Sequence, residues 1–308
     1  VARQTIHEEF GGVVPELASR AHQQNIVPVV DVALKKAGIT KDELSCIAFT
    51  QGPGLMGSLL VGGSFAKSMS MALNIPLIAI NHMKAHILAH FIDEEGYEKP
   101  EFPFLALTIS GGHTQIVQVN SFFDMKIIGE TTDDAVGEAF DKSAKILGLP
   151  YPGGPLVDKY ANEGNPKAFP FTKPKVDGLN FSFSGLKTQI LYFVQKQVKE
   201  NPNFIEEKKA DICASIQHTI IQILMDKLKK AVLETGINRI AIGGGVSANS
   251  GIRKTLKESE NKYGWKTYIP KFEYTTDNAA MIGIVGYYNY LEQNFSEADV
   301  VSKARIEF

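Results

Sequence analysis

The strongest constraint on the fold is a repeated order of apolar segment, glycine-rich turn and helix-like segment. It occurs in "CIAFTQGPGLMGSLLVGGSF" near the start of the chain and again in "RIAIGGGVSANSGIRKTLKE" near its end. A short apolar run that meets glycine and then takes on helical spacing is typical of a strand that turns directly into a helix. Two such units predict an α/β protein built from two halves.

The other expected elements fit this division. We expect a helix over residues 14–37, kinked or divided at Pro28, and a strand "PLIAI" that leads into a helix bearing histidines. Three strand-like runs over residues 103–132 precede a helix at about 135–147. Residues 1–100 with 279–308 are therefore predicted to form a first domain. Residues 101–278 form a second, with a helical and loop insertion at about 150–235.

Charge, hydropathy and cysteine usage exclude several classes of protein. The formal net charge of −2 gives no general attraction to nucleic acid or to a membrane surface. The most apolar stretch is interrupted by polar residues well short of the about 20 residues that a membrane span needs. Cys46 and Cys213 are far apart in the sequence, which fits a reducing cytoplasm, and neither is expected to bind metal.

The segment "NHMKAHILAH" places His82, His86 and His90 at four-residue steps. In a helix such residues lie one above the other, so His82 and His86 could point at one metal ion, or could simply form a polar face. A peptidase of the HExxH type is not favoured, because Met83 stands where the general base would be. A third ligand could come from Asp277, whose alternative role is to cap the last helix.

Two glycine turns have the character of phosphate or nucleotide sites. "TISGGHTQIV" could present bare backbone N–H groups to a phosphate or be a plain hairpin, with His113 beside it. The triple glycine Gly243, Gly244 and Gly245 could approach a base or phosphate, and the following helix start favours anions. A nicotinamide cofactor is not expected, because no acidic residue stands where a Rossmann ribose contact requires it.

Two further groups of side chains have both functional and ordinary readings. Asp141 and Asp158, near the Gly153–Gly154 pair, could hold ribose hydroxyls or be solvated helix charges. Basic residues are interleaved with aromatic ones between residues 142 and 187, and could bind nucleic acid through phosphate contacts and stacking. The residues are Lys142, Lys145, Lys173, Lys175 and Lys187 with Phe169, Phe171, Phe181 and Phe183.

Nine segments, in order along nearly the whole chain, resemble the TsaD family in its bacterial form, formerly called the glycoprotease family. They are "GGVVPELASRAHQQNI", "TQGPGLMGSL", "NHMKAH", "SGGHTQ", "DDAVGEAFDK", "YPGGP", "FSFSGLKT", "GGGVSAN" and "TTDNAAMIG". The resemblance implies an actin-like, sugar-kinase-like and Hsp70-like ATPase fold, with two domains around a nucleotide cleft. One family feature is missing: nothing before "VARQTIHEEF" matches the leading "GIETSCDDT" strand and turn, so the first domain is expected to lack its leading hairpin.

The resemblance also implies roles for particular residues. His82, His86 and Asp277 would hold one divalent metal, Fe(II) or Zn(II), and act in catalysis through it, with His113 as a further catalytic candidate. The glycine loop Gly243–Gly245 would contact the nucleotide. Threonylcarbamoyl-AMP, or ATP, ADP or AMP, would be bound by Thr108, Ile109, Ser110, Gly111, Gly112, Asp141, Gly154, Asp158 and Asn249.

The implied activity is transfer of threonylcarbamoyl from threonylcarbamoyl-AMP to N6 of the adenine 3′ of the anticodon, in tRNAs reading ANN codons. The implied partners are tRNA, a TsaB-like paralogue forming a heterodimer, a TsaE-like P-loop ATPase and an upstream threonylcarbamoyl-AMP synthase. The alternatives are an ATP-dependent small-molecule kinase and a non-catalytic nucleotide-binding module of the same fold superfamily. A kinase would have no use for paired imidazoles.

Overall fold

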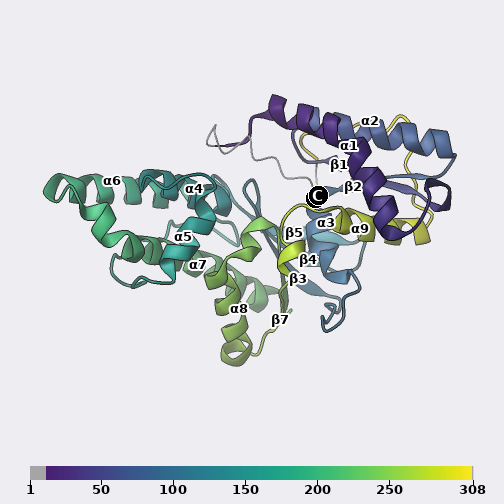
Figure 1. The fold of residues 1–308 in the computed structure, drawn as a ribbon. Coiled ribbons are helices and arrows are strands. Elements are labelled where there is room, and N and C mark those ends of the chain that lie inside the picture. Colours follow the sequence, from purple (N-terminus) through teal and green to yellow (C-terminus); the bar gives the residue numbers. More distant parts are fainter. Residues whose placement is uncertain (1–11, 307) are drawn as a thin grey trace. The chain divides into compact units, whose positions relative to one another are not determined.

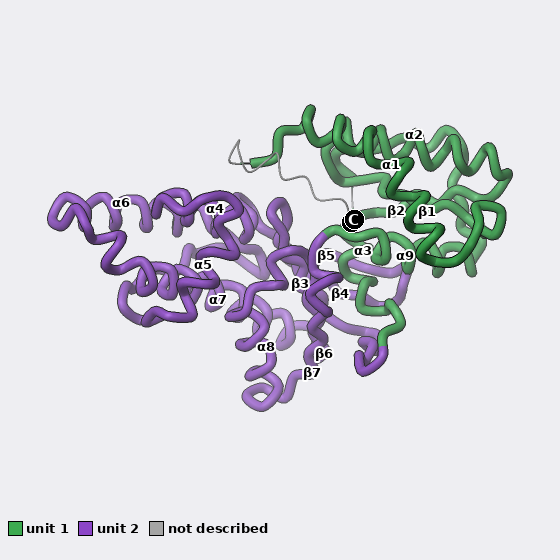
Figure 2. The backbone as a smooth tube through the Cα atoms, viewed as in Figure 1, with its two compact units in different colours: residues 1–94, 277–308 green, residues 95–276 purple. Residues whose placement is uncertain are grey.

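The computed structural model describes residues 12–306 and 308. The chain divides into two compact units, residues 1–94 with 277–308 and residues 95–276 (Figure 2). The expectation about a leading hairpin concerns the start of the chain, where residues 1–11 lie outside the described residues. Each unit is considered by itself below.

Unit 1 contains a pair of parallel strands with helices around it. Its elements are α1 (Pro15–Ala37), β1 (Ile47–Gly52), α2 (Met56–Leu73), β2 (Leu77–Asn81), α3 (His82–Leu88) and α9 (Ala279–Leu291). Strands β1 and β2 pair from Ile47 with Leu77 to Thr50 with Ile80, and α9 packs against both strands and α3. Of the two effects expected at Pro28, a kink or a division, the division is not found, because α1 continues through Pro28 as one helix. Gln24, whose carbonyl loses its donor at Pro28, is exposed to water.

Unit 2 is built on a mixed five-stranded sheet in the order β5-β4-β3-β6-β7. Strands β3 (Phe104–Ile109), β4 (Thr114–Val119) and β5 (Met125–Glu130) form an antiparallel meander. Strands β6 (Arg239–Gly243) and β7 (Lys266–Tyr268) continue the sheet in parallel from β3. All six residues of β3 are buried, as expected of a strand at the centre of a covered sheet.

The other regular elements of unit 2 are helices, which loops connect (Figure 1). They are α4 (Val136–Ile146), α5 (Gly153–Ala161), α6 (Ser184–Glu200), α7 (Phe204–Thr235) and α8 (Ser250–Tyr263), with short turns η4 (Gly245–Ala248) and η5 (Phe272–Tyr274). Helices α4, α6 and α7 share one apolar core with β3 and β6. Within the described part of the chain, no helix combines the length and the apolar character that crossing a bilayer requires.

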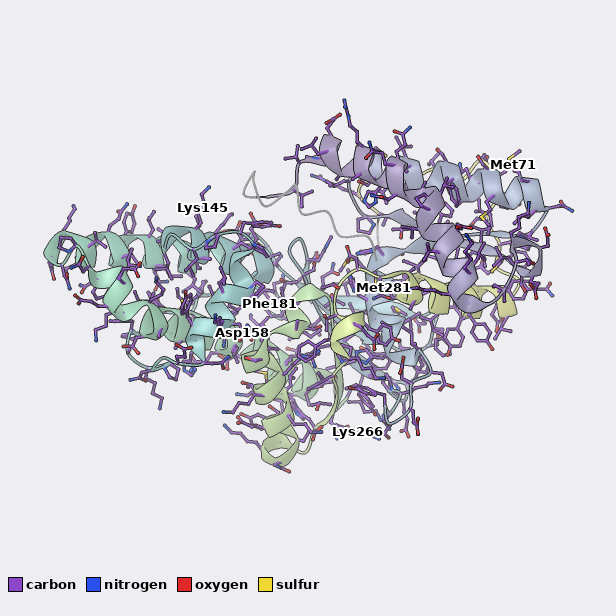
Figure 3. All side chains as sticks on the ribbon, in the orientation of Figure 1. Met71, Lys145, Asp158, Phe181, Lys266 and Met281 are labelled. Atoms are coloured by element: carbon purple, nitrogen blue, oxygen red, sulfur yellow. The ribbon has the colours of Figure 1, made fainter. Side chains whose placement is uncertain are left out.

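The aromatic residues that the sequence allowed as a nucleic-acid stacking surface lie in or against this core instead. Phe181 and Phe183 are fully buried, and Phe181 is marked in Figure 3. Phe169 and Phe171 are partly buried against the same cluster, where Phe193 packs on both. The stacking interpretation is therefore wrong for these phenylalanines. Large apolar side chains are more stable in the core of unit 2 than on its surface, because burial removes them from water.

We predict that Phe181→Ala lowers the free energy of unfolding by about 3–5 kcal/mol, because it empties a filled position in the core. Phe123→Ala is the control, since 48% of that side chain is exposed, and it is expected to change stability by less than about 1 kcal/mol. Chemical denaturation followed by circular dichroism measures both. Equal, small effects of the two substitutions would show that Phe181 is not a core residue.

Candidate metal centre and nucleotide site

The histidine helix begins directly at the end of a buried strand. The side chain of Asn81, the last residue of β2, accepts hydrogen bonds from the backbone N–H groups of Met83 and Lys84 at 2.9 and 3.2 Å. This cap satisfies two of the N–H groups that a helix start leaves without partners, so α3 can start at once. His82 is therefore the first helical residue, and His86 lies one turn further along the same face.

Asp277 is not the cap of α9. The capping residue is Asn278, whose Oδ1 accepts the backbone N–H of Met281 at 2.9 Å. The Asp277 carboxylate is thus released for another role, and its Oδ1 lies 3.1 Å from His82 Nε2 and 3.2 Å from His86 Nε2. This geometry favours the ligand interpretation of Asp277 over the capping one.

The three side chains have the donor types and the spacing of a metal centre. One ligand atom from each of His82, His86 and Asp277 lies within 4.8 Å of the others. Ligand atoms that bind one zinc-like ion at about 2.1 Å are separated by roughly 3.0–3.4 Å. The two imidazole rings are 4.7 Å apart and nearly perpendicular, so both Nε2 atoms can face one point. Two neutral imidazoles and a carboxylate fit Fe(II) or Zn(II) with coordination positions left for other ligands.

The electrostatics of the centre keep the carboxylate ionised. Desolvation by itself raises the pKa of the Asp277 carboxyl, but the hydrogen bonds and charges of His82 and His86 outweigh it and hold the pKa well below its usual range. His86 is buried, whereas 77% of the Asp277 side chain is exposed. Water therefore screens these attractions, and they contribute little to folding stability.

The third histidine of the segment and the domain boundary differ from the sequence pattern. His90 lies in the short turn η3 (Ala89–Phe91), beyond the end of α3, and is not part of the three-residue cluster. Asp277 itself belongs to unit 1, like the two histidines, although the sequence boundary placed it in the second domain. The buried Nδ1 of His86 has no hydrogen-bond partner among the residues that the structure describes. A metal-binding imidazole usually donates that second N–H group, so this atom departs from the common pattern.

In unit 2 the two glycine turns meet at one edge of the sheet. Thr108 pairs with Gly243, so the parallel strands β3 and β6 end side by side. The turn that follows β3 and the loop that follows β6 consequently lie next to each other. Gly244 has a φ of +88°, and a Cβ on it would lie 2.5 Å from the carbonyl oxygen of Ile109. Only glycine fits this close approach of two backbones.

Most of the expected nucleotide-site residues lie on a closed series of contacts around this edge. The backbone N–H of Gly137, at the start of α4, donates to the Ser110 carbonyl at 3.1 Å. Asp141, one turn along α4, accepts the N–H groups of Gly153 and Gly154 with Oδ1, both at 2.9 Å. Helix α5 then carries Asp158, marked in Figure 3, whose carboxylate reaches the start of α8.

The acidic and amide side chains of this series are already engaged within the protein. Asp158 accepts the backbone N–H of Ser250 at 2.9 Å and its hydroxyl at 2.8 Å. Asn249 caps α8 through the N–H of Ile252 at 3.0 Å and donates its amide to Gln217 at 2.7 Å. The start of α8 was expected to favour anions, but its Ser250 and Ile252 N–H groups already donate to protein oxygens.

The turn after β3 keeps one backbone donor available. The N–H of Ser110 donates to the carbonyl of His113, while the N–H groups of Gly112 and His113 donate to Ser110 Oγ. Within the described residues, the N–H of Gly111 has no acceptor, and a Cβ at Gly111 would meet nothing within 4 Å. A phosphate oxygen can therefore approach the chain here.

Sequence reasoning did not assign three residues that hold the site. Thr114 Oγ1 accepts the N–H of Val136 and starts α4, Ser250 is bound by Asp158, and Gln217 is bound by Asn249. Thr114 lies in the quoted segment "SGGHTQ", so a capping role could have been considered. Gln217 had no such signal, because a single polar residue in a long helix is usually on its surface.

Comparison with known proteins agrees with the nine sequence segments. The sequence profile of the TsaD family, described as tRNA N6-adenosine threonylcarbamoyltransferase, matches residues 1–284. A protein of that name from Christiangramia forsetii is 72% identical over 308 residues, which are 100% of this chain and 91% of that protein. One from Cytophaga hutchinsonii is 58% identical over 306 residues, 99% of this chain and 88% of that protein.

The chain belongs to the TsaD family. The family and the enzyme class expected from the sequence are thereby confirmed. A crystal structure of full-length HypF in its phosphate- and nucleotide-bound form has a TM-score of 0.58 at 14% identity, covering 86% of this chain and 41% of that one. The HypF of T. kodakarensis has a TM-score of 0.60 at 16% identity, covering 84% and 42%. These similarities support the expected actin-like α/β fold.

For this TsaD protein we predict that His86→Ala abolishes binding of one metal ion per chain. Loss of an outer hydrogen-bond partner already weakens a metal site by about 10–100-fold, so loss of a ligand is expected to cost more than about 100-fold. Titration with Fe(II) and with Zn(II), together with elemental analysis, measures the effect. His22→Ala, on the exposed surface of α1, is the control and should bind like the wild type. Undiminished binding by His86→Ala would refute the site.

We also predict that Gly244→Ala lowers the free energy of unfolding by about 1–3 kcal/mol or more, since it adds backbone strain and a clash with Ile109. Gly245→Ala is the matched control, because a Cβ there would meet nothing within 4 Å. It should change stability by no more than about 0.5 kcal/mol. Thermal and chemical unfolding compare the two, and equal stabilities would contradict the close packing of the loop on β3.

Proposed function

We propose that this chain transfers the threonylcarbamoyl group from threonylcarbamoyl-AMP to N6 of the adenine 3′ of the anticodon, in tRNAs that read ANN codons. The observation that carries the proposal is the convergence of His82, His86 and Asp277, in a member of the TsaD family, on one point where a metal fits. The curated relatives bear the name of this activity. A kinase has no comparable support, because paired imidazoles serve no step of phosphoryl transfer to a small molecule.

The donor set supports Fe(II) or Zn(II) as the metal, held by the Nε2 atoms of His82 and His86 and by Asp277 Oδ1. When bound, such an ion supplies Lewis-acid stabilisation of negative charge on phosphate or carbonyl oxygens. The paired histidines are pre-organised for it, because Asn81 fixes the start of their helix. Because Asn278 caps α9, the neighbouring Asp277 carboxylate is not needed as a cap.

The chemistry asked of the protein itself is mainly positioning. Threonylcarbamoyl-AMP is an activated mixed anhydride, so attack by N6 at the carbamoyl carbon breaks the bond to the phosphate and releases AMP, without a covalent enzyme intermediate. In this proposal the Gly111 N–H donates to a phosphate oxygen, a role that the open space at Gly111 supports. Asp141 uses Oδ1 for the α5 start, which leaves Oδ2 to accept a ribose hydroxyl. His113 is our candidate for taking the proton from N6.

The proposed assembly includes other proteins. A net charge of −2 gives little attraction to tRNA, which supports binding by a complex and not by this chain alone. Helices α1 and α2 pack together and carry exposed apolar side chains, among them Val27, Val32, Leu60 and Met71. They support a protein partner on unit 1, and we propose a TsaB-like paralogue. A TsaE-like ATPase and a threonylcarbamoyl-AMP synthase complete the proposed set, in the cytoplasm.

The proposal predicts that metal-loaded protein, given threonylcarbamoyl-AMP, tRNA and the partner proteins, forms threonylcarbamoyladenosine and AMP in equal amounts. Mass spectrometry of tRNA nucleosides measures the product. His86→Ala and metal-stripped protein should form little product, whereas Leu233→Ala, on the exposed surface of α7, should match the wild type. Full turnover by metal-stripped protein would refute the metal role. Binding of the adenylate without any turnover, with all partners present, would show a non-catalytic module.

A further inference from the structure

The buried side chain of Gln217 has no role in the mechanism proposed above. It lies on α7, in the middle of the longest helix of unit 2, and only 6% of it is exposed. A buried amide is costly unless its polar atoms find partners. Its Oε1 accepts the side-chain N–H of Asn249 at 2.7 Å, a short hydrogen bond between two buried amides. Asn249 is one of the residues that the family resemblance assigns to the adenylate.

The orientation of the Asn249 amide is set from both sides. Its Oδ1 accepts the N–H of Ile252, which fixes the oxygen toward α8. Its nitrogen must then face Gln217 Oε1. A primary amide carries two N–H groups. One is taken by Gln217, so the second is left in a fixed direction for another acceptor.

The backbone around this pair has little room to adjust. A Cβ on Gly251 would lie 2.7 Å from Gln217 Nε2 and 2.9 Å from Ile221 Cδ1, so the first turn of α8 is packed tightly on α7. Both amides are more than nine-tenths buried. Water therefore cannot easily replace Gln217 as the acceptor for Asn249. Asp158 on α5 also holds the start of α8, through Ser250. The start of α8 is therefore fixed by α5 through Asp158 and by α7 through Gln217.

We propose that Gln217 is a positioning residue for the adenylate. By accepting one N–H of Asn249, it directs the other N–H at the nucleotide and keeps the loop Gly243–Asn249 in its binding conformation. The inference rests on the proposed function, since it takes Asn249 to contact the nucleotide. It goes beyond that function by assigning a role to a residue on α7 that touches no substrate.

The test uses AMP as the probe and isothermal titration calorimetry with the full chain. Gln217→Met keeps the length of the side chain but removes the acceptor, and is expected to weaken AMP binding on the order of tenfold. Gln217→Glu keeps an acceptor and should restore most of the affinity. Gln222→Met is the matched control, because Gln222 is exposed on the same helix and bonds only to His218 among the described residues. It should bind AMP like the wild type.

A double-mutant cycle separates positioning from general destabilisation. If Gln217 acts through Asn249, then Gln217→Met combined with Asn249→Ala should bind AMP no more weakly than Asn249→Ala alone. Strictly additive losses would overturn the inference. So would wild-type affinity in Gln217→Met while Asn249→Ala is impaired. If Asn249→Ala itself binds AMP normally, the nucleotide site of the proposed function fails, which is a different outcome.

A measurement on the unaltered protein keeps the inference testable if Gln217→Met does not fold. With asparagine side chains labelled with ¹⁵N, the two Nδ2 protons of Asn249 should differ in NMR. The one bonded to Gln217 should exchange slowly with solvent, and AMP should shift the other one more strongly. Equal, fast exchange of both protons, or no shift with AMP, would overturn the proposal.

Discussion

The parallel pairing of β3 with β6 is the constraint on which the candidate nucleotide site depends. The strands are far apart in sequence, yet Thr108 pairs with Gly243, so both chains leave the sheet at the same edge. This pairing brings the turn Ser110–Gly112 next to the loop Gly243–Gly245. The close contact of Gly244 with Ile109 then fixes the separation of the two turns, which a side chain larger than hydrogen would increase.

Asparagine caps perform a second task at both sites. Asn81, Asn278 and Asn249 each cap a helix, at α3, α9 and α8. In unit 1 the effect is to free the neighbouring residue, because His82 follows one cap and Asp277 precedes another. In unit 2 the cap itself is the candidate ligand contact. A side chain whose oxygen is committed to the helix still has an amide nitrogen to offer, which an aspartate in the same position would lack.

The sequence predicted the order of elements and the proximity of His82, His86 and Asp277, for reasons that differ between regions. Glycine turns after apolar runs are local signals, so β6, the loop and α8 were found close to their observed bounds. The nine ordered segments identified the family, and with it the pairing of Asp277 with the histidines, which no local pattern could give. The sequence left the role of the phenylalanines between residues 169 and 183 open, because interleaved lysines look the same whether the aromatic ring faces water or a core. Gln217 was missed because its partner, Asn249, is brought to it only by the packing of α8 on α7.

Most polar groups at the nucleotide edge are already satisfied by the protein, and this shapes what a ligand can gain there. The N–H groups at the starts of α4, α5 and α8 donate to Thr114, Asp141 and Asp158. These N–H groups are available to an anion only if it displaces a carboxylate or hydroxyl, which weakens the ordinary attraction of these helix N-termini for phosphate. Among the described residues, the groups that remain include the Gly111 N–H, Asp141 Oδ2 and one N–H of Asn249. Under the proposed function, a nucleotide that matches these positions is favoured over phosphate in general.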